Sequence, residues 1–67
     1  MKLKDLLNTV DKNTKICICD NMGPHTEVLP WGKIPAIDIL QIAEREVDHI
    51  YVDEGDNSLT IDLVDLD

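Results

Sequence analysis

The chain has 67 residues, of which 43% are apolar, and its 14 acidic and six basic side chains give a net charge of −8. A chain of this length forms one small domain that buries only about 60% of the surface exposed by its unfolded form. This excludes a multidomain enzyme or a large self-contained cofactor site. The acidity argues against direct binding of DNA or RNA, because nucleic-acid-binding modules need a basic footprint.

The compartment is inferred from the apolar pattern and the cysteines. No apolar run is long enough for a membrane helix, and residues 1–10 lack the apolar segment of a signal peptide. Cys17 and Cys19 are separated by one residue. On a strand their side chains would point the same way about 6.5 Å apart, which is poor disulfide geometry. We therefore expect two reduced thiols and a cytoplasmic location.

The first half of the chain predicts one helix followed by two strands. Aliphatic side chains recur at the spacing of one helix face and predict a short amphipathic helix over residues 2–10. Residues 15–20 alternate and include two isoleucines on one face, which predicts a strand. A weaker strand is predicted over residues 26–31, because Pro30 cannot donate a hydrogen bond to a central ladder.

The second half predicts another helix and two more strands. Pro35 is suited to the first turn of a helix, and a wide aliphatic stripe over residues 36–45 predicts a second helix that is more buried than the first. Residues 47–52 form a predicted strand, and the loop at residues 53–57 carries the Gly and Asn typical of a hairpin. Residues 59–64 alternate most regularly and predict the last strand.

These elements predict an α+β fold with the order α-β-β-α-β-β. We expect a single domain over residues 1–67, with an antiparallel sheet of about four strands and both helices on one face. Short motifs recur at an offset of 33 residues, a faint internal repeat with halves 1–31 and 36–65. The second sheet face is left open, and Leu66 and Asp67 are expected to fray.

A metal site is one interpretation of the thiols and imidazoles. Cys17, Cys19, His25 and His49 could complete a tetrahedral zinc site, although zinc sites usually separate their cysteines by two to four residues. The alternative is two thiols that behave as small apolar side chains and two surface imidazoles.

The carboxylates of residues 53–57 suit calcium, but the glycine is the third residue of this loop, whereas an EF-hand has glycine at its sixth position. A solvated hairpin loop is the alternative there, and no cofactor is expected.

The sequence contains no recognisable catalytic motif. Ser58 is the single serine and has no G-x-S-x-G around it, and the three glycines form no phosphate-binding loop. Neither cysteine neighbours a feature that would lower a thiol pKa. A pocket of useful volume is difficult to build from 67 residues. We therefore predict that the protein is not an enzyme.

The acidity is concentrated in one half. Residues 1–35 carry a net charge of +1, whereas residues 36–67 set ten acids against Arg45 and carry −9. Such a surface resembles the phosphate rows of nucleic acid in charge and could dock on the basic groove of a nucleic-acid-binding protein. The alternative is that the acids only keep a small domain soluble and protect its edge strands. The candidate partner-binding residues are Asp48, Asp53, Glu54, Asp56, Asp62 and Asp65, with Trp31 as an aromatic anchor or as a cap on the core.

Four segments carry a resemblance to a group of known proteins. The start M-K-L-K-D-L-L, the segment N-T-K-I-C-I-C-D, a V-x-x-I-Y-V strand and a final L-T-I-D-L strand resemble small acidic proteins encoded by phages and mobile elements of Firmicutes, from Met1 to about Leu63. The resemblance implies a small αββ-type domain with a role in host interaction. Several such proteins are anti-defence factors, including anti-CRISPR proteins, some of which mimic DNA.

Together these features predict a non-enzymatic protein-interaction module. It would be a phage or mobile-element inhibitor that binds a host protein with a basic nucleic-acid-binding surface, such as a CRISPR effector. It would bind neither nucleic acid nor membrane directly, and a homodimer is left open. Two alternatives remain: a small zinc-binding domain that uses the four ligands named above, and a structural or assembly protein that dimerises through the open sheet face.

Overall fold

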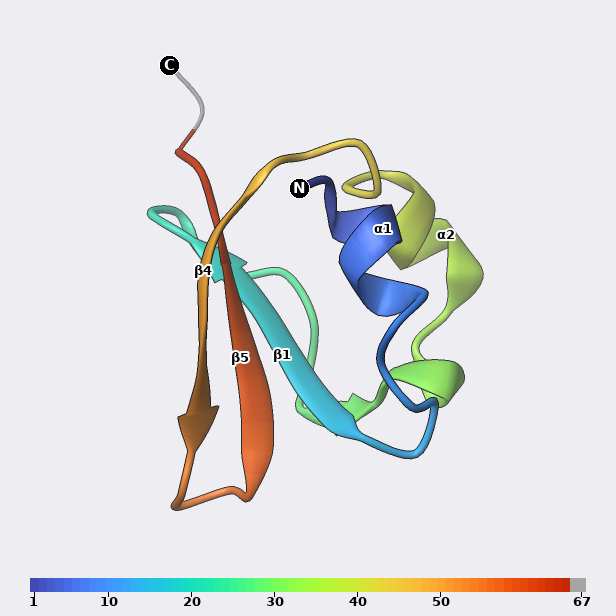
Figure 1. The fold of residues 1–67 in the computed structure, drawn as a ribbon, viewed down its shortest axis with the longest axis vertical. Coiled ribbons are helices and arrows are strands. Elements are labelled where there is room, and N and C mark those ends of the chain that lie inside the picture. The colour runs from blue at the N-terminus through green and yellow to red at the C-terminus, as the bar shows by residue number, and fades with distance from the viewer. Residues whose placement is uncertain (66–67) are drawn as a thin grey trace.

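The computed structural model describes residues 1–65, so the predicted fraying of Leu66 and Asp67 lies outside the described residues. Residues 1–65 form two short helices and five strands, which confirms the α+β class. Both helices lie to the same side of the sheet (Figure 1). Within residues 1–65 no helix is long and apolar enough to cross a membrane. The elements are α1 (Leu3–Leu7), β1 (Lys15–Asp20), β2 (Gly23–Pro24), β3 (Leu29–Pro30), a 3-10 turn (Trp31–Lys33), α2 (Ala36–Leu40), β4 (Val47–Asp53) and β5 (Ser58–Leu63).

The sheet is mixed, and the prediction of an antiparallel sheet is wrong in this respect. Its strand order is β2-β1-β5-β4, and β3 also pairs with β1. β1 runs parallel to β5, with Ile16 opposite Leu59, while the other strand pairs are antiparallel. Antiparallel neighbours can be joined by a tight hairpin, whereas parallel neighbours need a long crossover. Here the chain between β1 and β5 supplies that crossover, and it includes α2 and β4.

The core lies between α1 and the two central strands. α1 turns its leucines towards the sheet, and the spacing that predicted this helix is confirmed, although the helix is shorter than expected. The Thr9 hydroxyl donates to the Leu6 carbonyl at 2.7 Å, where the helix ends. The buried aliphatic side chains are Leu3, Leu6, Leu7, Ile16, Ile18, Ile34, Ile42, Ile61 and Leu63.

The second helix is the least buried element of the helical layer, so the prediction of a more buried helix is wrong. α2 has five residues, none of them buried, and Ile37 and Leu40 are 65% and 73% exposed. These two side chains are three residues apart and share a helix face, and that face points to solvent. Ile42, in the turns that follow α2, is buried and joins the core instead.

The predicted strand over residues 26–31 is reduced to the two residues of β3. The preceding segment is held to β1 by other contacts: the Thr26 hydroxyl accepts the Ile18 amide at 3.3 Å, and the His25 amide donates to the Ile18 carbonyl at 2.7 Å. A threonine side chain therefore occupies the place where a regular strand would offer a backbone carbonyl. Pairing resumes only at Leu29, opposite Ile16.

Candidate interaction surface

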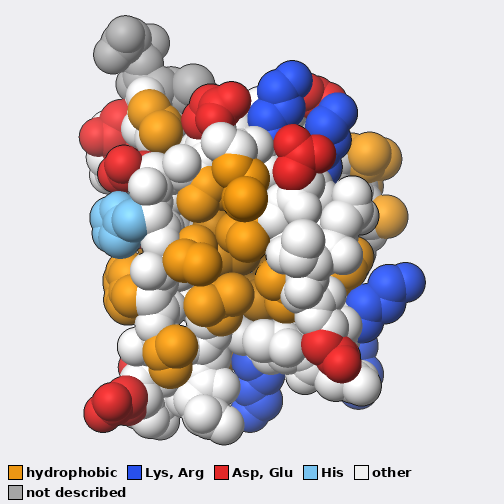
Figure 2. Space-filling view, viewed as in Figure 1, with side chains coloured by type: hydrophobic (Ala, Val, Ile, Leu, Met, Phe, Trp, Pro, Cys, Tyr) orange, Lys and Arg blue, Asp and Glu red, His pale blue; other side chains and the backbone are white. Residues whose placement is uncertain are grey.

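β4 is an edge strand that the helices do not cover. It pairs with β5 on one side, with Ile50 opposite Ile61 and Tyr51 opposite Thr60. Ile50, Tyr51 and Val52 are 46%, 49% and 64% exposed. Figure 1 shows α1 and α2 over the β1 side of the sheet, away from β4. Figure 2, drawn from the same direction, shows hydrophobic side chains gathered in a band through the middle of the molecule, with acidic side chains near the two ends of the band.

One acidic cluster surrounds His49, and we call it the His49 patch: Asp48, Asp62 and Asp65. These three residues and His49 line one shallow pocket of about 290 Å³. The imidazole Nε2 lies 2.9 Å from a carboxylate oxygen of Asp62, and Nδ1 lies 3.3 Å from Asp48. The structure thus brings together three of the six acids predicted to bind a partner. Sequence reasoning did not place His49 among them.

The other three acids form the hairpin-tip patch: Asp53, Glu54 and Asp56. Asp53 shapes the turn, because its carboxylate accepts the Gly55 amide at 2.9 Å and the Asp56 amide at 3.4 Å. Glu54 and Asp56 are exposed. Because a strand rises by about 3.4 Å per residue, the two patches lie roughly 15 Å apart at opposite ends of β4. The predicted acidic face is therefore two patches with an apolar stretch between them.

Two acids just before β4, Glu44 and Glu46, are neutralised within the chain. The Glu44 carboxylate accepts hydrogen bonds from Lys2 at 2.7 Å and from Lys4 at 2.6 Å. These two lysines hold the pKa of Glu44 at about 2, and Glu44 raises the pKa of Lys2 in return. The N-terminal ammonium lies 2.9 Å from Glu46. Lys2, Lys4 and the N-terminal ammonium thus neutralise two acids of the second half, whereas the acids of the β4–β5 hairpin contact no lysine or arginine among residues 1–65.

Asp20, at the end of β1, has a structural role. Its carboxylate lies 2.8 Å from Nε2 of His25 and 3.0 Å from Nη1 of Arg45, and its side chain is only 2% exposed. His25, the Met22 amide and Arg45 together lower the pKa of Asp20 to about 2. Nη2 of Arg45 also donates to the Val64 carbonyl at 2.9 Å. This network ties β1 to the segments that follow α2 and β5.

The four candidate zinc ligands point to different partners. Cys17 and Cys19 are free thiols on one face of β1, opposite Thr60 and Asp62, as their spacing predicted. The Cys19 thiol donates to Asp62 at 2.8 Å, His49 contacts the other oxygen of Asp62, and His25 contacts Asp20. In the described part of the chain, no group of three or more His, Cys, Asp or Glu side chains is arranged to hold a metal ion.

Both thiols are held in the protonated form. Burial raises the pKa of Cys17, and burial together with the Asp62 hydrogen bond raises the pKa of Cys19 to about 12. The thiolate, not the thiol, is the metal ligand and the nucleophile. The surroundings of the two cysteines therefore disfavour both of these roles at neutral pH.

Trp31 lies on the helical side of the molecule, in the turn between β3 and α2. Its indole nitrogen donates to the Val10 carbonyl at 2.8 Å, and Nζ of Lys12 lies 5.7 Å from the ring centroid. The ring packs against the core and is only partly exposed. The structure thus places Trp31 apart from the six acids, in the position of a core cap.

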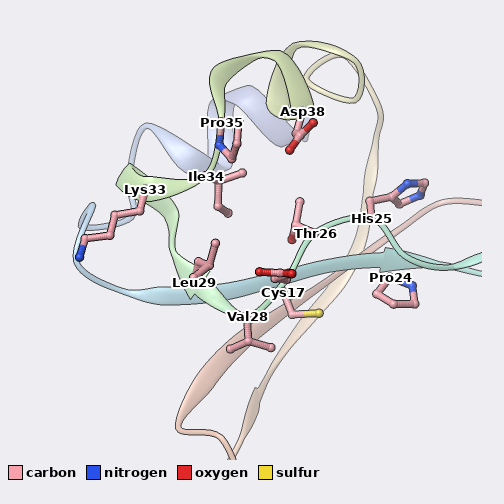
Figure 3. A pocket seen from close by; sticks show the side chains of 11 residues that line it. Cys17, Pro24, His25, Thr26, Val28, Leu29, Lys33, Ile34, Pro35 and Asp38 are labelled. Carbon is pink, nitrogen blue, oxygen red and sulfur yellow. The ribbon is translucent and has the colours of Figure 1, made fainter.

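A groove lies between α2 and the edge of β1, framed by the segment from Pro24 to Leu29 (Figure 3). Its volume is about 810 Å³, and Val28, Leu29, Ile34 and Pro35 supply its aliphatic lining. Figure 3 shows Lys33 at one end of the groove, Pro24 and His25 at the other, and Asp38 on its α2 wall. Sequence reasoning did not find this groove, because it results from the irregular path of the segment that was predicted as a strand.

The hairpin combines three properties. It offers an unpaired strand edge, exposed apolar side chains, and carboxylates at both ends that no lysine or arginine among residues 1–65 contacts. Each property is a known means of binding another protein, through backbone pairing, apolar contact and charge complementarity respectively.

Comparison of the chain with protein-family models, curated proteins and solved structures finds no significant match.

Proposed function

We propose that the protein is a non-enzymatic interaction module that binds a basic protein surface through the His49 patch and the hairpin-tip patch. The observation that carries this proposal is the uneven neutralisation of the acids. Glu44 and Asp20 are satisfied by bases of the same chain, whereas Glu54 and Asp56 are exposed and make no ion pair among the described residues. Unneutralised acids gain most from a basic partner.

The spacing of the patches indicates the kind of partner. Two acidic clusters roughly 15 Å apart suit a protein that presents basic side chains along both walls of a groove about as wide as a nucleic acid. Grooves that bind DNA carry lysines and arginines for phosphate rows separated by a major groove of about 12 Å. The proposed partner is therefore a nucleic-acid-binding protein, whose groove this domain would occupy as an inhibitor. Assignment of this role to a phage or mobile element, with a CRISPR effector as the target, follows from the sequence resemblance.

Affinity capture on the immobilised protein tests the proposal. We expect the captured proteins to be nucleic-acid binders and to be released in about 1 M salt, where the Debye length falls to about 3 Å. Added duplex DNA should compete for them. Capture that resists salt, or partners that do not bind nucleic acid, would contradict the proposal.

A matched pair of variants localises the binding. Glu54→Gln with Asp56→Asn removes two charges from the hairpin tip, and we expect captured partner to bind about tenfold more weakly, which corresponds to ~1.4 kcal/mol. Glu27→Gln with Asp5→Asn removes the same two charges from exposed sites away from the hairpin. Equal losses in both variants would show that net charge alone, rather than the hairpin, determines binding.

A further inference from the structure

The outer edge of β4 has unused pairing capacity. β4 pairs with β5 along one edge. At the start of the other edge the Val47 amide donates to the Met1 carbonyl at 2.8 Å, but no strand within residues 1–65 pairs with residues 49–53 there. The register shift in this pair lies between Val47 and His49, so residues 49–53 form a regular run. Natural edge strands are usually protected by proline, lysine or a bulge. Residues 49–53 contain neither proline nor lysine, and Val52 is 64% exposed.

We propose that β4 pairs antiparallel with β4 of a second copy, about a two-fold axis at Tyr51, so that the two sheets join into one. In this register Ile50 faces Val52 of the second copy, and His49 faces Asp53 of the second copy. The two Tyr51 rings face each other at the axis. Each of these cross-strand pairs is favourable: apolar with apolar, imidazole with carboxylate, and aromatic with aromatic.

The other registers match poorly. Residues that face each other in an antiparallel pair point to the same side of the sheet, so the two-fold axis of a joined sheet must pass through a residue of β4. An axis at Ile50 would set Val52 against Asp48, and an axis at Val52 would set Ile50 against Glu54. The axis at Tyr51 avoids both of these apolar–acid pairs. It sets Asp48 opposite Glu54 of the second copy at the ends of the paired segment, a like-charge contact that added salt would screen. The sequence of residues 49–53 therefore favours this register.

The joined sheet also extends the apolar band. Ile50 and Val52 lie on the same sheet face as their partners Ile61 and Leu59, which is the face that α1 covers over β5. In the dimer, two such stripes lie side by side, and each shields part of the other from water.

Formation of the dimer is opposed by the net charge of −8 on each copy. Added salt screens this repulsion and should strengthen the dimer, whereas salt should weaken the binding of a basic partner.

Sedimentation equilibrium over micromolar to millimolar concentrations tests the dimer. The mass should rise from 7.6 kDa towards twice that value, and the rise should begin at lower concentration when salt is added. Tyr51→Lys sets two ammonium groups against each other at the axis and should keep the protein monomeric. Met22→Lys adds the same charge at a residue that is 85% exposed and far from the β4 edge, and it should dimerise like the parent. A parent protein that stays at 7.6 kDa throughout would overturn the proposal.

Cysteine cross-linking tests the register. In a background with Cys17→Ser and Cys19→Ser, Tyr51→Cys places two thiols directly opposite each other, about 5 Å apart between Cβ atoms. His49→Cys places them four residues out of register, about 13 Å apart, which a disulfide cannot span. Mild oxidation should therefore cross-link the Tyr51→Cys variant alone. Equal cross-linking of the two variants indicates random collision, and preferential cross-linking at position 49 indicates another register; either result contradicts the proposal.

Discussion

The two strands of the β4–β5 hairpin have opposite environments, although they pair along almost their full length. β5 lies between β1 and β4, and its Ile61 is fully buried beneath α1. β4 forms the edge, and its Ile50, which faces Ile61 directly, is nearly half exposed. The same residue type at paired positions therefore contributes to the core in one strand and to the surface in the other. The position of the strand in the sheet, rather than its own sequence, determines whether the isoleucine is buried or exposed.

This difference separates the tasks of stability and binding. The buried leucines and isoleucines of α1, β1 and β5 form one cluster, to which β4 contributes only the partly buried Val47. Ile50, Tyr51 and Val52 on β4 are exposed, and Glu54 and Asp56 in the hairpin loop are exposed and make no ion pair among the described residues. The side chains proposed to bind a partner can therefore change with little effect on folding, because they are not part of the core.

The largest expected effect comes from the facing isoleucines. Ile61→Ala should lower the free energy of unfolding by about 3 kcal/mol, because it leaves a cavity in a packed core, whereas Ile50→Ala should cost less than about 1 kcal/mol. Urea denaturation at low protein concentration, followed by circular dichroism, measures both. Because a domain this small has little stability to lose, Ile61→Val, with an expected cost of about 1 kcal/mol, provides a milder comparison. A loss at Ile50 equal to that at Ile61 would show that β4 is part of the core.

A smaller effect is expected at the Asp20 network on the covered side. The folded-state pKa of Asp20 is about 2, below its ordinary value of 3.8, so its ionised form stabilises the fold above that value and this contribution is lost as the pH falls through about 2. His25→Ala removes the strongest of its partners and should raise the Asp20 pKa and lower the melting temperature at neutral pH. The difference between the parent and the variant should shrink as the pH approaches 2. A difference that does not depend on pH would contradict the role given to His25.

The smallest effect on stability is expected on the open face, where Asp62 joins Cys19 to His49. Asp62→Asn removes the negative charge beside the thiol, so the pKa of Cys19 should fall from about 12 and its alkylation at alkaline pH should accelerate. The cost in unfolding free energy should stay below about 1 kcal/mol. Iodoacetamide labelling, read by mass spectrometry with Cys17 as the internal reference, measures the rate. Asp48→Asn, which leaves the Cys19 contact intact, should not change it.

Local patterns predicted the central strands well. The alternation in residues 15–20 placed Ile16 and Ile18 on the core face and both thiols on the other, as the structure has them. The last strand was predicted from the same kind of alternation, but Ser58 and Thr60 on its other face are buried as well. The prediction for residues 15–20 held because burial on one face leaves a period of two in the sequence.

The remaining errors concern relations between distant segments. The parallel pairing of β1 with β5 has no local signature, because it depends on the path of the crossover between them. The aliphatic stripe near Ile37 predicted a buried helix, but α1 already covers the central strands and α2 is left outside. The charge count identified the acidic half correctly. It did not show that lysines at the start of the chain neutralise Glu44, since that contact spans 42 residues for Lys2.

The parallel pairing of β1 and β5 also bears on how the protein is made. Partners in this pair are 43 residues apart, as Cys19 and Asp62 are, and β5 is synthesised after every other strand of the sheet although it occupies an interior position. α1 and β1 therefore leave the ribosome without the strand that completes their apolar surface. Folding of this domain cannot be completed before β5 is available, and it should be slow for a domain of this size, since contacts of high sequence separation delay the rate-limiting step. During that interval, the nascent N-terminal segment would be a substrate for chaperones.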